Sequence, residues 1–233
     1  MRVVFFDAAG TLFQVKGTVG QVYLDLAKSY GVRTSAEALQ QAFRRAFADA
    51  PPLAFSLASA TDIKACERLW WFDVVHNVFY RVGMFERFDQ YFEEVFAHFA
   101  SSESWELFPE TIATLLAMEE RGIELGIVSN FDSRLYEILV GLGIDRFFES
   151  VTISSFAGVA KPSPQIFLRA LAKHGAVPKD ALHVGDSLHE DVHGALAAGI
   201  KAVLLKREPE PDGLTGVQTI TNLYEAISIM ETG

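Results

Sequence analysis

The sequence has a single cysteine, Cys66, among its 233 residues. One cysteine cannot form an intramolecular disulfide, and this scarcity is typical of proteins from a reducing compartment. No group of Cys and His residues with zinc-ligand spacing accompanies it. Because Cys66 lies among apolar residues of an expected helix, we interpret it as a buried, inert thiol rather than a nucleophile. We therefore expect a cytoplasmic protein without disulfides.

Basic residues and long apolar runs are also scarce. The 20 Lys and Arg residues are outnumbered by 30 Asp and Glu residues, which gives a net charge of -10 and disfavours binding to a nucleic-acid backbone. Apolar runs such as residues 3–6 are too short to span a bilayer, and the N-terminus does not resemble a secretory signal. We expect a soluble monomer or homodimer with no nucleic-acid or membrane partner.

Hydrophobic residues, in contrast, make up half of the chain and include 19 Phe, enough for a large core. Residues 2–6 predict a buried strand that ends in the turn D-A-A-G. From about residue 17 to residue 100 the apolar spacing is helical, with Ser35 and Thr61 as expected helix caps and Leu69 on an inward face. We expect no strand in this block.

After Ser101 the pattern changes to alternating strands and helices. The expected strands are 124–128, 151–153, 181–184 and 201–205, and the expected helices lie near 110–121, 132–142, 163–174, 189–198 and 221–231. This alternation predicts right-handed crossovers and a parallel sheet with helices on both faces, which the strand at residues 2–6 must join. The predicted fold class is therefore α/β, a three-layer doubly wound parallel sheet. We expect a core of residues 1–13 and 104–233, with residues 14–103 inserted as an all-helical cap.

Polar residues stand where the expected strands end, at Asp7, Ser129, Asn130, Lys161 and Asp186. In an open parallel sheet the carboxyl ends of the strands form one crevice, so these distant residues should converge. Two carboxylates suit Mg²⁺, a hard cation that prefers carboxylate, water and phosphate oxygens. Lys161 and Ser129 are then placed to hold the oxygens of a phosphoryl group.

These residues carry a resemblance to a known family. The motifs D-A-A-G-T-L at 7–12, V-S-N at 128–130, K-P at 161–162 and G-D-S-L-H-E-D at 185–191 resemble, in this order, those of the haloacid dehalogenase superfamily. The stretches V-G-Q-V-Y, L-W-W-F-D-V-V and S-N-F-D-S-R-L also resemble the branch called haloacid dehalogenase-like hydrolase domain-containing protein 3. The resemblance covers essentially the whole chain and implies a Rossmann-like core with a helical cap.

The resemblance also implies roles for individual residues. Asp7 becomes the nucleophile that forms an aspartyl-phosphate, with Ser129 and Lys161 as further catalytic groups. The residues implied to bind a small phosphorylated substrate are Thr11, Ser129, Asn130 and Lys161. Those implied to hold Mg²⁺ are Asp7, Asp186, Asp191 and the backbone carbonyl of Ala9. The implied activity is that of a Mg²⁺-dependent phosphatase.

One position departs from the family pattern. Phosphatases of this family carry a second Asp two residues after the nucleophile, as an acid and base, where this chain has Ala9. General acid–base catalysis is worth ~10²–10⁴-fold in rate, so its loss should raise the barrier by roughly 3–5 kcal/mol. A phosphatase weakened in this way would need good leaving groups.

Three other interpretations stay open on the sequence. A haloacid dehalogenase also lacks the second Asp, but it usually has Tyr at this position and does not need the full metal motif. A phosphonoacetaldehyde hydrolase carries D-x-A-G-T and needs a cap lysine, for which Lys64 is the only candidate inside the long helix. A protein could also bind phosphorylated ligands without hydrolysing them.

Two histidine patterns favour plainer interpretations. Residues 189–193, H-E-D-V-H, match the zinc-protease pattern H-E-x-x-H, but no third ligand is evident, and we interpret both histidines as surface residues beside the metal site. His183 lies inside an expected strand, so we expect a hydrogen-bonded core histidine rather than a base.

Overall fold

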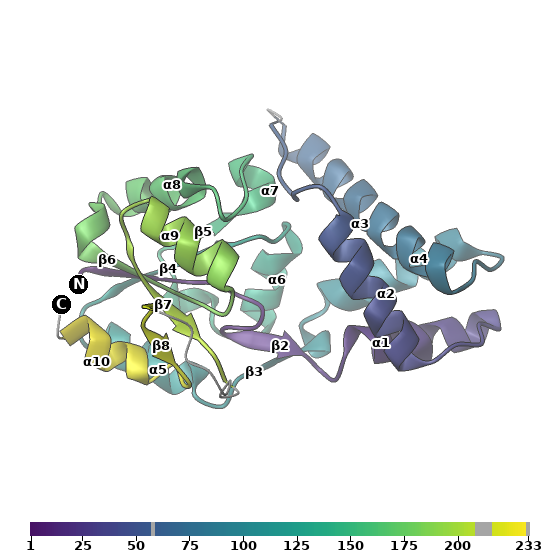
Figure 1. Ribbon diagram of the computed structural model, residues 1–233, viewed down its shortest axis with the longest axis horizontal. Coiled ribbons are helices and arrows are strands. Elements are labelled where there is room, and N and C mark those ends of the chain that lie inside the picture. The colour runs from purple at the N-terminus through teal and green to yellow at the C-terminus, as the bar shows by residue number, and fades with distance from the viewer. Residues whose placement is uncertain (57–58, 208–215, 232–233) are drawn as a thin grey trace.

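The computed structural model describes residues 1–56, 59–207 and 216–231 and contains a parallel β-sheet at its centre (Figure 1). Its strand order is β5-β4-β1-β6-β7-β8, and every neighbouring pair is parallel. The strands are β1 (Val3–Phe6), β4 (Glu124–Ser129), β5 (Ser150–Ile153), β6 (Ala181–Gly185), β7 (Lys201–Leu205) and β8 (Thr219–Ile220). The predicted α/β fold class is thereby confirmed.

Strand β1 occupies the middle of this sheet, and all of its residues are buried. Val3 and Phe5 pack into one hydrophobic cluster, whereas Val4 and Phe6 pack into another on the opposite face. A strand buried on both faces requires a continuous apolar run, and V-V-F-F supplies it. Phe6 pairs with β4 on one side and with β6 on the other, so the carboxyl ends of these three strands lie together.

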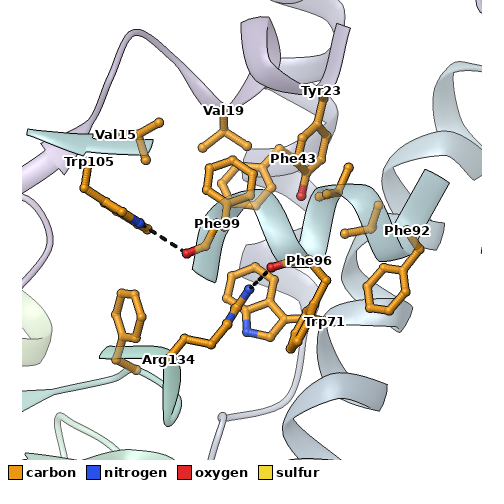
Figure 2. A pocket seen from close by; sticks show the side chains of 13 residues that line it. Val15, Val19, Tyr23, Phe43, Trp71, Phe92, Phe96, Phe99, Trp105 and Arg134 are labelled. Atoms are coloured by element: carbon orange, nitrogen blue, oxygen red, sulfur yellow. Dashed lines mark hydrogen bonds between the residues drawn. The ribbon is translucent and has the colours of Figure 1, made fainter. Parts of the chain in front are cut away.

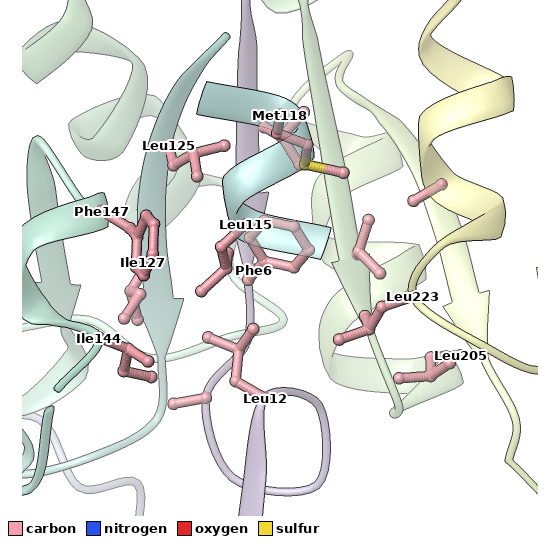
Figure 3. Close-up of a cluster of buried hydrophobic side chains, with 14 of the residues drawn as sticks. Phe6, Leu12, Leu115, Met118, Leu125, Ile127, Ile144, Phe147, Leu205 and Leu223 are labelled. Atoms are coloured by element: carbon pink, nitrogen blue, oxygen red, sulfur yellow. The ribbon is translucent and has the colours of Figure 1, made fainter. Parts of the chain in front are cut away.

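Helices cover both faces of the sheet. The helices α5 (Thr111–Glu119), α6 (Arg134–Gly141) and α10 (Glu225–Glu231) lie over one face, and α8 (Pro164–His174) and α9 (Gly194–Ala197) over the other. Figure 3 shows Phe6 beside Leu115 and Met118 of α5 in the first of these layers. The ends of α8 follow from its sequence: Ser163 caps it, Pro164 opens it, and Gly175 ends it with a φ of 55°.

The helical block lies to one side of the sheet, at the right of Figure 1, and has a hydrophobic cluster of its own. Its helices are α1 (Val19–Ala27), α2 (Ala36–Asp49), α3 (Ala60–Val82) and α4 (Phe88–Ala100). Tyr23, Phe79, Tyr91 and Phe92 are almost completely buried between them. We propose that residues 14–103 act as a cap on a core of residues 1–13 and 104–233. Of the helices in the described part of the chain, none has the length and apolarity needed to cross a bilayer.

Details of the helical block differ from the sequence-based expectation. Ser35 caps α2 as predicted, accepting a hydrogen bond from the backbone N–H of Ala38 at 3.1 Å. Thr61, however, is wrong as the cap of α3, which begins at Ala60 after Ser59. The inward position of Leu69 is also wrong: this side chain is 60% exposed, because the neighbouring Trp70 takes the buried face.

The described residues between 17 and 100 contain no strand, as expected, but two short strands that flank the block were not predicted. Strand β2 (Phe13–Val15) pairs antiparallel with β3 (Trp105–Leu107), and this two-stranded ribbon joins the helical block to the rest of the chain. Strand β8 and the short helix α7 (Ser154–Ala157) were missed as well. Two- to four-residue elements are too short to show a hydrophobic period, so periodicity alone could not reveal them.

A set of polar contacts ties the helical block to the segment that follows β4. Glu67 of α3, which is 2% exposed, accepts hydrogen bonds from the backbone N–H of Ser133 at 2.9 Å and from its hydroxyl at 2.5 Å. The Trp71 indole N–H donates to the fully buried Asp132 at 2.5 Å. Asp132 also accepts from the backbone N–H of Arg134 at 2.9 Å, so residues from two parts of the chain satisfy the first N–H groups of α6.

Arg134 completes this connection, which we call the interdomain latch (Glu67, Trp71, Asp132, Ser133 and Arg134). Its guanidinium donates to Asp132 at 2.9 and 2.6 Å and lies 4.2 Å from the ring centre of Phe96 in α4. It also donates to the Phe96 carbonyl at 3.3 Å (Figure 2). Asp132 and Ser133 lie only a few residues after Ser129. Helices of the helical block therefore contact the loop that begins with the predicted site residue Asn130.

Removal of the Glu67 carboxylate should destabilise the fold. In Glu67→Ala the Ser133 N–H and hydroxyl lose their acceptor, and a buried unsatisfied donor lowers the free energy of unfolding by roughly 1–3 kcal/mol. Urea denaturation measures this change. Asp73→Ala, on an exposed position of the same helix, is the matched control and should stay within about 0.5 kcal/mol of the wild type. Equal stability of both variants would contradict a stabilising role for the latch.

Candidate active site

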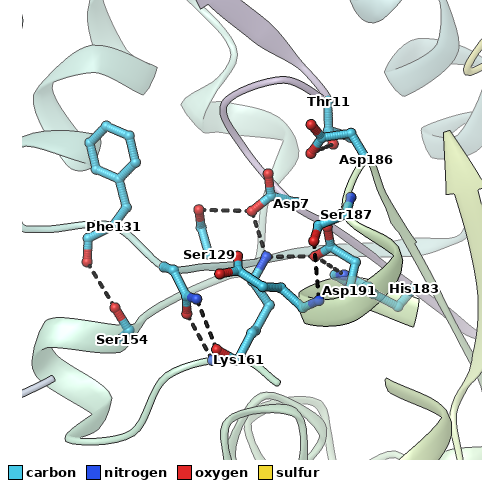
Figure 4. A network of polar contacts seen from close by, with 12 residues as sticks. Asp7, Thr11, Ser129, Phe131, Ser154, Lys161, His183, Asp186, Ser187 and Asp191 are labelled. Atoms are coloured by element: carbon cyan, nitrogen blue, oxygen red, sulfur yellow. Dashed lines mark hydrogen bonds and ion pairs between the residues drawn. The ribbon is translucent and has the colours of Figure 1, made fainter. Parts of the chain in front are cut away.

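The predicted site residues converge at the carboxyl edge of the sheet (Figure 4). Asp7 follows β1, Ser129 ends β4, and Asp186 follows β6. Oxygen atoms of Asp7, Asp186 and Asp191 all lie within 4.8 Å of one another. Segments more than 170 residues apart in the sequence therefore meet, because β1 lies between β4 and β6 and these strands end side by side.

The carboxylate of Asp7 is held by two donors on one of its oxygens. The Ser129 hydroxyl donates to Oδ1 at 2.9 Å, and the Lys161 ammonium donates to the same atom at 2.6 Å. Asp7 is 7% exposed and Lys161 is 4% exposed, so this ion pair is largely removed from water. Among the described residues no hydrogen bond reaches the second oxygen, Oδ2, of Asp7.

Lys161 has a second carboxylate partner in Asp191. Its ammonium donates to Asp191 Oδ1 at 2.6 Å, and His183 Nε2 lies 2.9 Å from the same oxygen. The backbone N–H of Ser187 donates to Asp191 Oδ2 at 3.0 Å. His183 is completely buried, which confirms the expectation of a hydrogen-bonded core histidine. Asp191 thus holds the Lys161 ammonium in position beside Asp7.

Burial and the neighbouring charges shift the pKa values of the three carboxylates. Burial raises the pKa of Asp7, and the neighbouring Asp191 carboxylate adds to the shift while Lys161 opposes it. Asp186 lies at the exposed rim, but the partial burial of its carboxyl and the charges of Asp7 and Asp191 raise its pKa to about 7. Burial would also raise the pKa of Asp191, yet Lys161 and His183 outweigh it and hold this pKa below its usual range.

Lys161 itself remains an ammonium group. Burial alone would lower its pKa, but the Asp191 and Asp7 carboxylates raise the pKa above its usual range. The ammonium therefore stays charged at neutral pH, and its charge is available to an anionic ligand. The excess of negative charge around it is the electrostatic condition that a divalent cation relieves.

Two glycines provide room for the carboxylates of Asp186 and Asp191, because a side chain at either position would collide with one of them. Gly10 has a φ of 92°, and a Cβ atom built on it would lie 2.6 Å from Asp186 Oδ2. A Cβ atom on Gly185 would overlap the carboxylate of Asp191. The glycine of D-A-A-G and that of G-D-S thus let Asp186 and Asp191 approach the backbone closely enough to reach Asp7.

The other predicted site residues lie beside this cluster in different ways. Thr11 is fully buried, with its hydroxyl 3.5 Å from Asp186 Oδ1. Asn130 uses its amide group on the backbone of Lys161, donating to the carbonyl at 3.0 Å and accepting from the N–H at 2.8 Å. It therefore fixes the loop that presents Lys161. Ala9 is half-buried and lines the cleft above Asp7.

The cluster forms the floor of a cleft of about 540 Å³ between the sheet edge and the helical block. The residues of the block that line it, which we call the cap wall, are Phe47, Ala48, Ala50, Pro51, Pro52, Leu53, Trp70 and Trp71. Sequence reasoning did not place this wall, since periodicity shows only that a helix has an apolar face. It also missed Glu190, which lines the cleft and whose pKa is raised by burial. Its place in G-D-S-L-H-E-D was the available signal.

Residues that supported other interpretations lie outside the cleft. Lys64 is exposed and does not line the cleft, which disfavours it as a Schiff-base lysine. His189 and His193 are both exposed, and within the described residues neither belongs to the one carboxylate group that is close enough to hold a metal. Cys66 is half-buried rather than buried.

Comparisons with known proteins agree with this geometry. A family model for haloacid dehalogenase-like hydrolases matches residues 1–199. Haloacid dehalogenase-like hydrolase domain-containing protein 3 of Bos taurus is 32% identical over 213 residues, which are 91% of this chain and 84% of that protein. Phosphoserine phosphatase of Thermus thermophilus is 29% identical over 229 residues and 91% of each chain.

A solved structure shows the same fold over the whole length. The 2-haloacid dehalogenase of Pseudomonas syringae pv. Tomato has a TM-score of 0.68 and 21% identity, and the match covers 100% of this chain and 99% of that one. The family model and the relatives show more than the fold, because they match most of the chain in sequence. The chain therefore belongs to the haloacid dehalogenase-like hydrolases, in the branch of domain-containing protein 3, and is a hydrolase.

Proposed function

We propose that this protein is a phosphatase that hydrolyses small phosphate esters through a covalent intermediate on Asp7. The observation that carries this proposal is the Asp7 carboxylate, whose Oδ1 is held by Ser129 at 2.9 Å and Lys161 at 2.6 Å. With Oδ1 fixed in this way, we assign the attack on phosphorus to Oδ2. The similarity to a phosphoserine phosphatase over 91% of the chain supports this choice of reaction.

The residues of the chain account for the transfer of the phosphoryl group to Asp7. Asp7 forms a bond to phosphorus as the bond between phosphorus and the leaving oxygen breaks, and water then releases phosphate from the acyl phosphate. The Lys161 ammonium, which stays charged, neutralises the phosphoryl oxygens together with the Ser129 hydroxyl. Asp191 and His183 act as positioning residues, because Asp191 accepts a hydrogen bond from the Lys161 ammonium and His183 contacts the same carboxylate oxygen.

The carboxylate cluster fits a divalent cation, and we propose Mg²⁺. Asp7 and Asp186 would hold it, with Asp191 and the Ala9 carbonyl in support, because oxygen atoms of the three carboxylates lie within 4.8 Å of one another. When bound, such an ion supplies charge neutralisation to the transferring phosphoryl group.

Ala9 makes the nature of the leaving group important. The chain has no carboxyl group two residues after Asp7 to protonate the departing oxygen. We therefore expect efficient turnover only of substrates whose leaving group is stable as an anion, such as acyl and aryl phosphates. Alkyl phosphates depend more strongly on protonation and should react slowly.

The test of the proposed function is Asp7→Asn, which keeps the shape of the nucleophile and removes its charge. With 4-nitrophenyl phosphate and Mg²⁺, release of inorganic phosphate should fall by about a thousandfold or more. Halide release from chloroacetate serves as the parallel assay. Halide release without phosphate release would favour a dehalogenase, and binding of phosphate without either activity would favour a non-catalytic binding protein.

Mg²⁺ should stabilise the folded protein. A ligand at about 100 times its Kd that binds only the folded state adds about 2.7 kcal/mol, which for a chain of this size raises Tm by several degrees. Asp186→Asn should remove most of this shift, measured by differential scanning calorimetry with and without Mg²⁺. Asp145→Asn, an exposed carboxylate outside the cluster, is the control and should keep the shift. A full shift in Asp186→Asn would contradict the metal site.

A carboxyl group at residue 9 should restore general acid catalysis. We expect Ala9→Asp to raise kcat/KM for alkyl phosphates by roughly 10–10³-fold and to change acyl and aryl phosphates less. Ala9→Asn is the matched control, because it adds the same volume without an ionisable proton. If both variants behave alike on every substrate while still binding Mg²⁺, Ala9 does not limit the reaction.

A further inference from the structure

Aromatic side chains line the cleft that holds the carboxylate cluster. Phe47, Trp70 and Trp71 belong to the cap wall, and their rings contact one another, with 5.7 Å between the centres of Phe47 and Trp70 and 4.9 Å between those of Trp70 and Trp71. Trp105 and Phe131 line the same cleft, with ring centres 5.9 Å apart. Five of the residues that line the cleft are thus aromatic.

Charged groups are confined to the floor of this cleft. Among the described lining residues, the charged side chains are Asp7, Lys161, Asp186, Glu190 and Asp191, and all of them follow strands of the sheet. The cap wall contributes none. Its polar ring atoms are already used, because the Trp70 indole donates to the Pro51 carbonyl at 2.8 Å and the Trp71 indole donates to Asp132. A charged or hydroxyl-rich leaving group would find no free polar side chain on this wall.

A small apolar recess of about 90 Å³ adjoins the cleft (Figure 2). Val15, Trp71, Trp105 and Phe131 line both the recess and the cleft, so the two spaces share a wall. Among the described residues that line the recess, the one charged side chain is that of Arg134, whose guanidinium is paired with Asp132 at 2.6 Å. An apolar group that enters from the cleft therefore meets hydrophobic surface and no free charge.

We propose that the substrate of this site is a phosphate monoester of an uncharged phenol, with its aromatic ring against Phe47, Trp70 and Trp71. This inference rests on the phosphatase function proposed above and specifies its substrate class. In the first step the Asp7 oxygen bonds to phosphorus, the bond to the aryl oxygen breaks, and its electron pair leaves on the aryloxide, which takes a proton from water. Delocalisation into the ring stabilises that anion, so the missing carboxyl at Ala9 and the aromatic wall favour the same leaving group.

Substrates in which the aromatic ring and the stability of the leaving group vary separately test the proposal. We expect kcat/KM for 2-naphthyl phosphate to exceed that for acetyl phosphate, although acetate is the better leaving group, and to exceed that for phosphoserine. A higher kcat/KM for acetyl phosphate or phosphoserine would overturn the aromatic substrate class and leave the phosphatase function intact. No phosphate release from any of the three would overturn the proposed function itself.

Phe47→Ala tests the wall directly. Phe47 is 44% exposed, so the fold should tolerate the change, and loss of the ring contact should lower kcat/KM for 2-naphthyl phosphate by roughly 5- to 20-fold. The value for acetyl phosphate should change less than about twofold. Tyr80→Ala removes an aromatic ring that is 74% exposed on α3 and does not line the cleft, and it should leave both values unchanged. Equal losses on both substrates in Phe47→Ala, or in Phe47→Leu if the first variant unfolds, would overturn the role of the wall.

Discussion

The buried ammonium of Lys161 lies between Asp7 and Asp191 at 2.6 Å from each, and the active-site architecture depends on this arrangement. Without the lysine, carboxylates that are 7% and 1% exposed would remain buried without a counter-charge. Removal of one partner from a buried ion pair typically costs about 3–5 kcal/mol, because the other charge stays behind. Strands β1 and β6, the loop after β5 and the turn after β6 must therefore all be in place before the site is electrostatically stable.

The same arrangement suits the anion and the cation that we propose for this site. Burial and the charges of Asp7 and Asp191 raise the pKa of Asp186 to about 7, and a divalent ion would relieve the repulsion among the three carboxylates. Lys161 and Ser129 approach Asp7 from the other side and present donors where phosphoryl oxygens would lie. The Lys161 ammonium and the other two carboxylates thus both border Asp7. The cap wall above them contributes apolar surface and no charged side chain.

Much of this could be predicted from the sequence, because the decisive signals are local. V-V-F-F is a continuous apolar run that only a strand buried on both faces can use, and Asp7 directly follows it. The strand at Lys201–Leu205 was predicted with its observed bounds, since apolar residues fill it and a turn precedes it. Once parallel strands are expected, their carboxyl ends must meet, so the convergence of Ser129 and Asp186 on Asp7 followed from topology.

Contacts between distant segments could not be predicted in this way. Glu67 looks like any acidic helix residue until α3 places it on the Ser133 N–H, and neither Trp71 nor Asp132 carries a local sign that they meet. The ribbon of β2 and β3 is likewise too short to show a period. The sequence by itself therefore determined the sheet, the family and the charged floor of the site, because strand pattern and polar residues at strand ends are written along the chain. Only the tertiary structure decided the latch and the aromatic wall, because these depend on which helix faces pack against which loops.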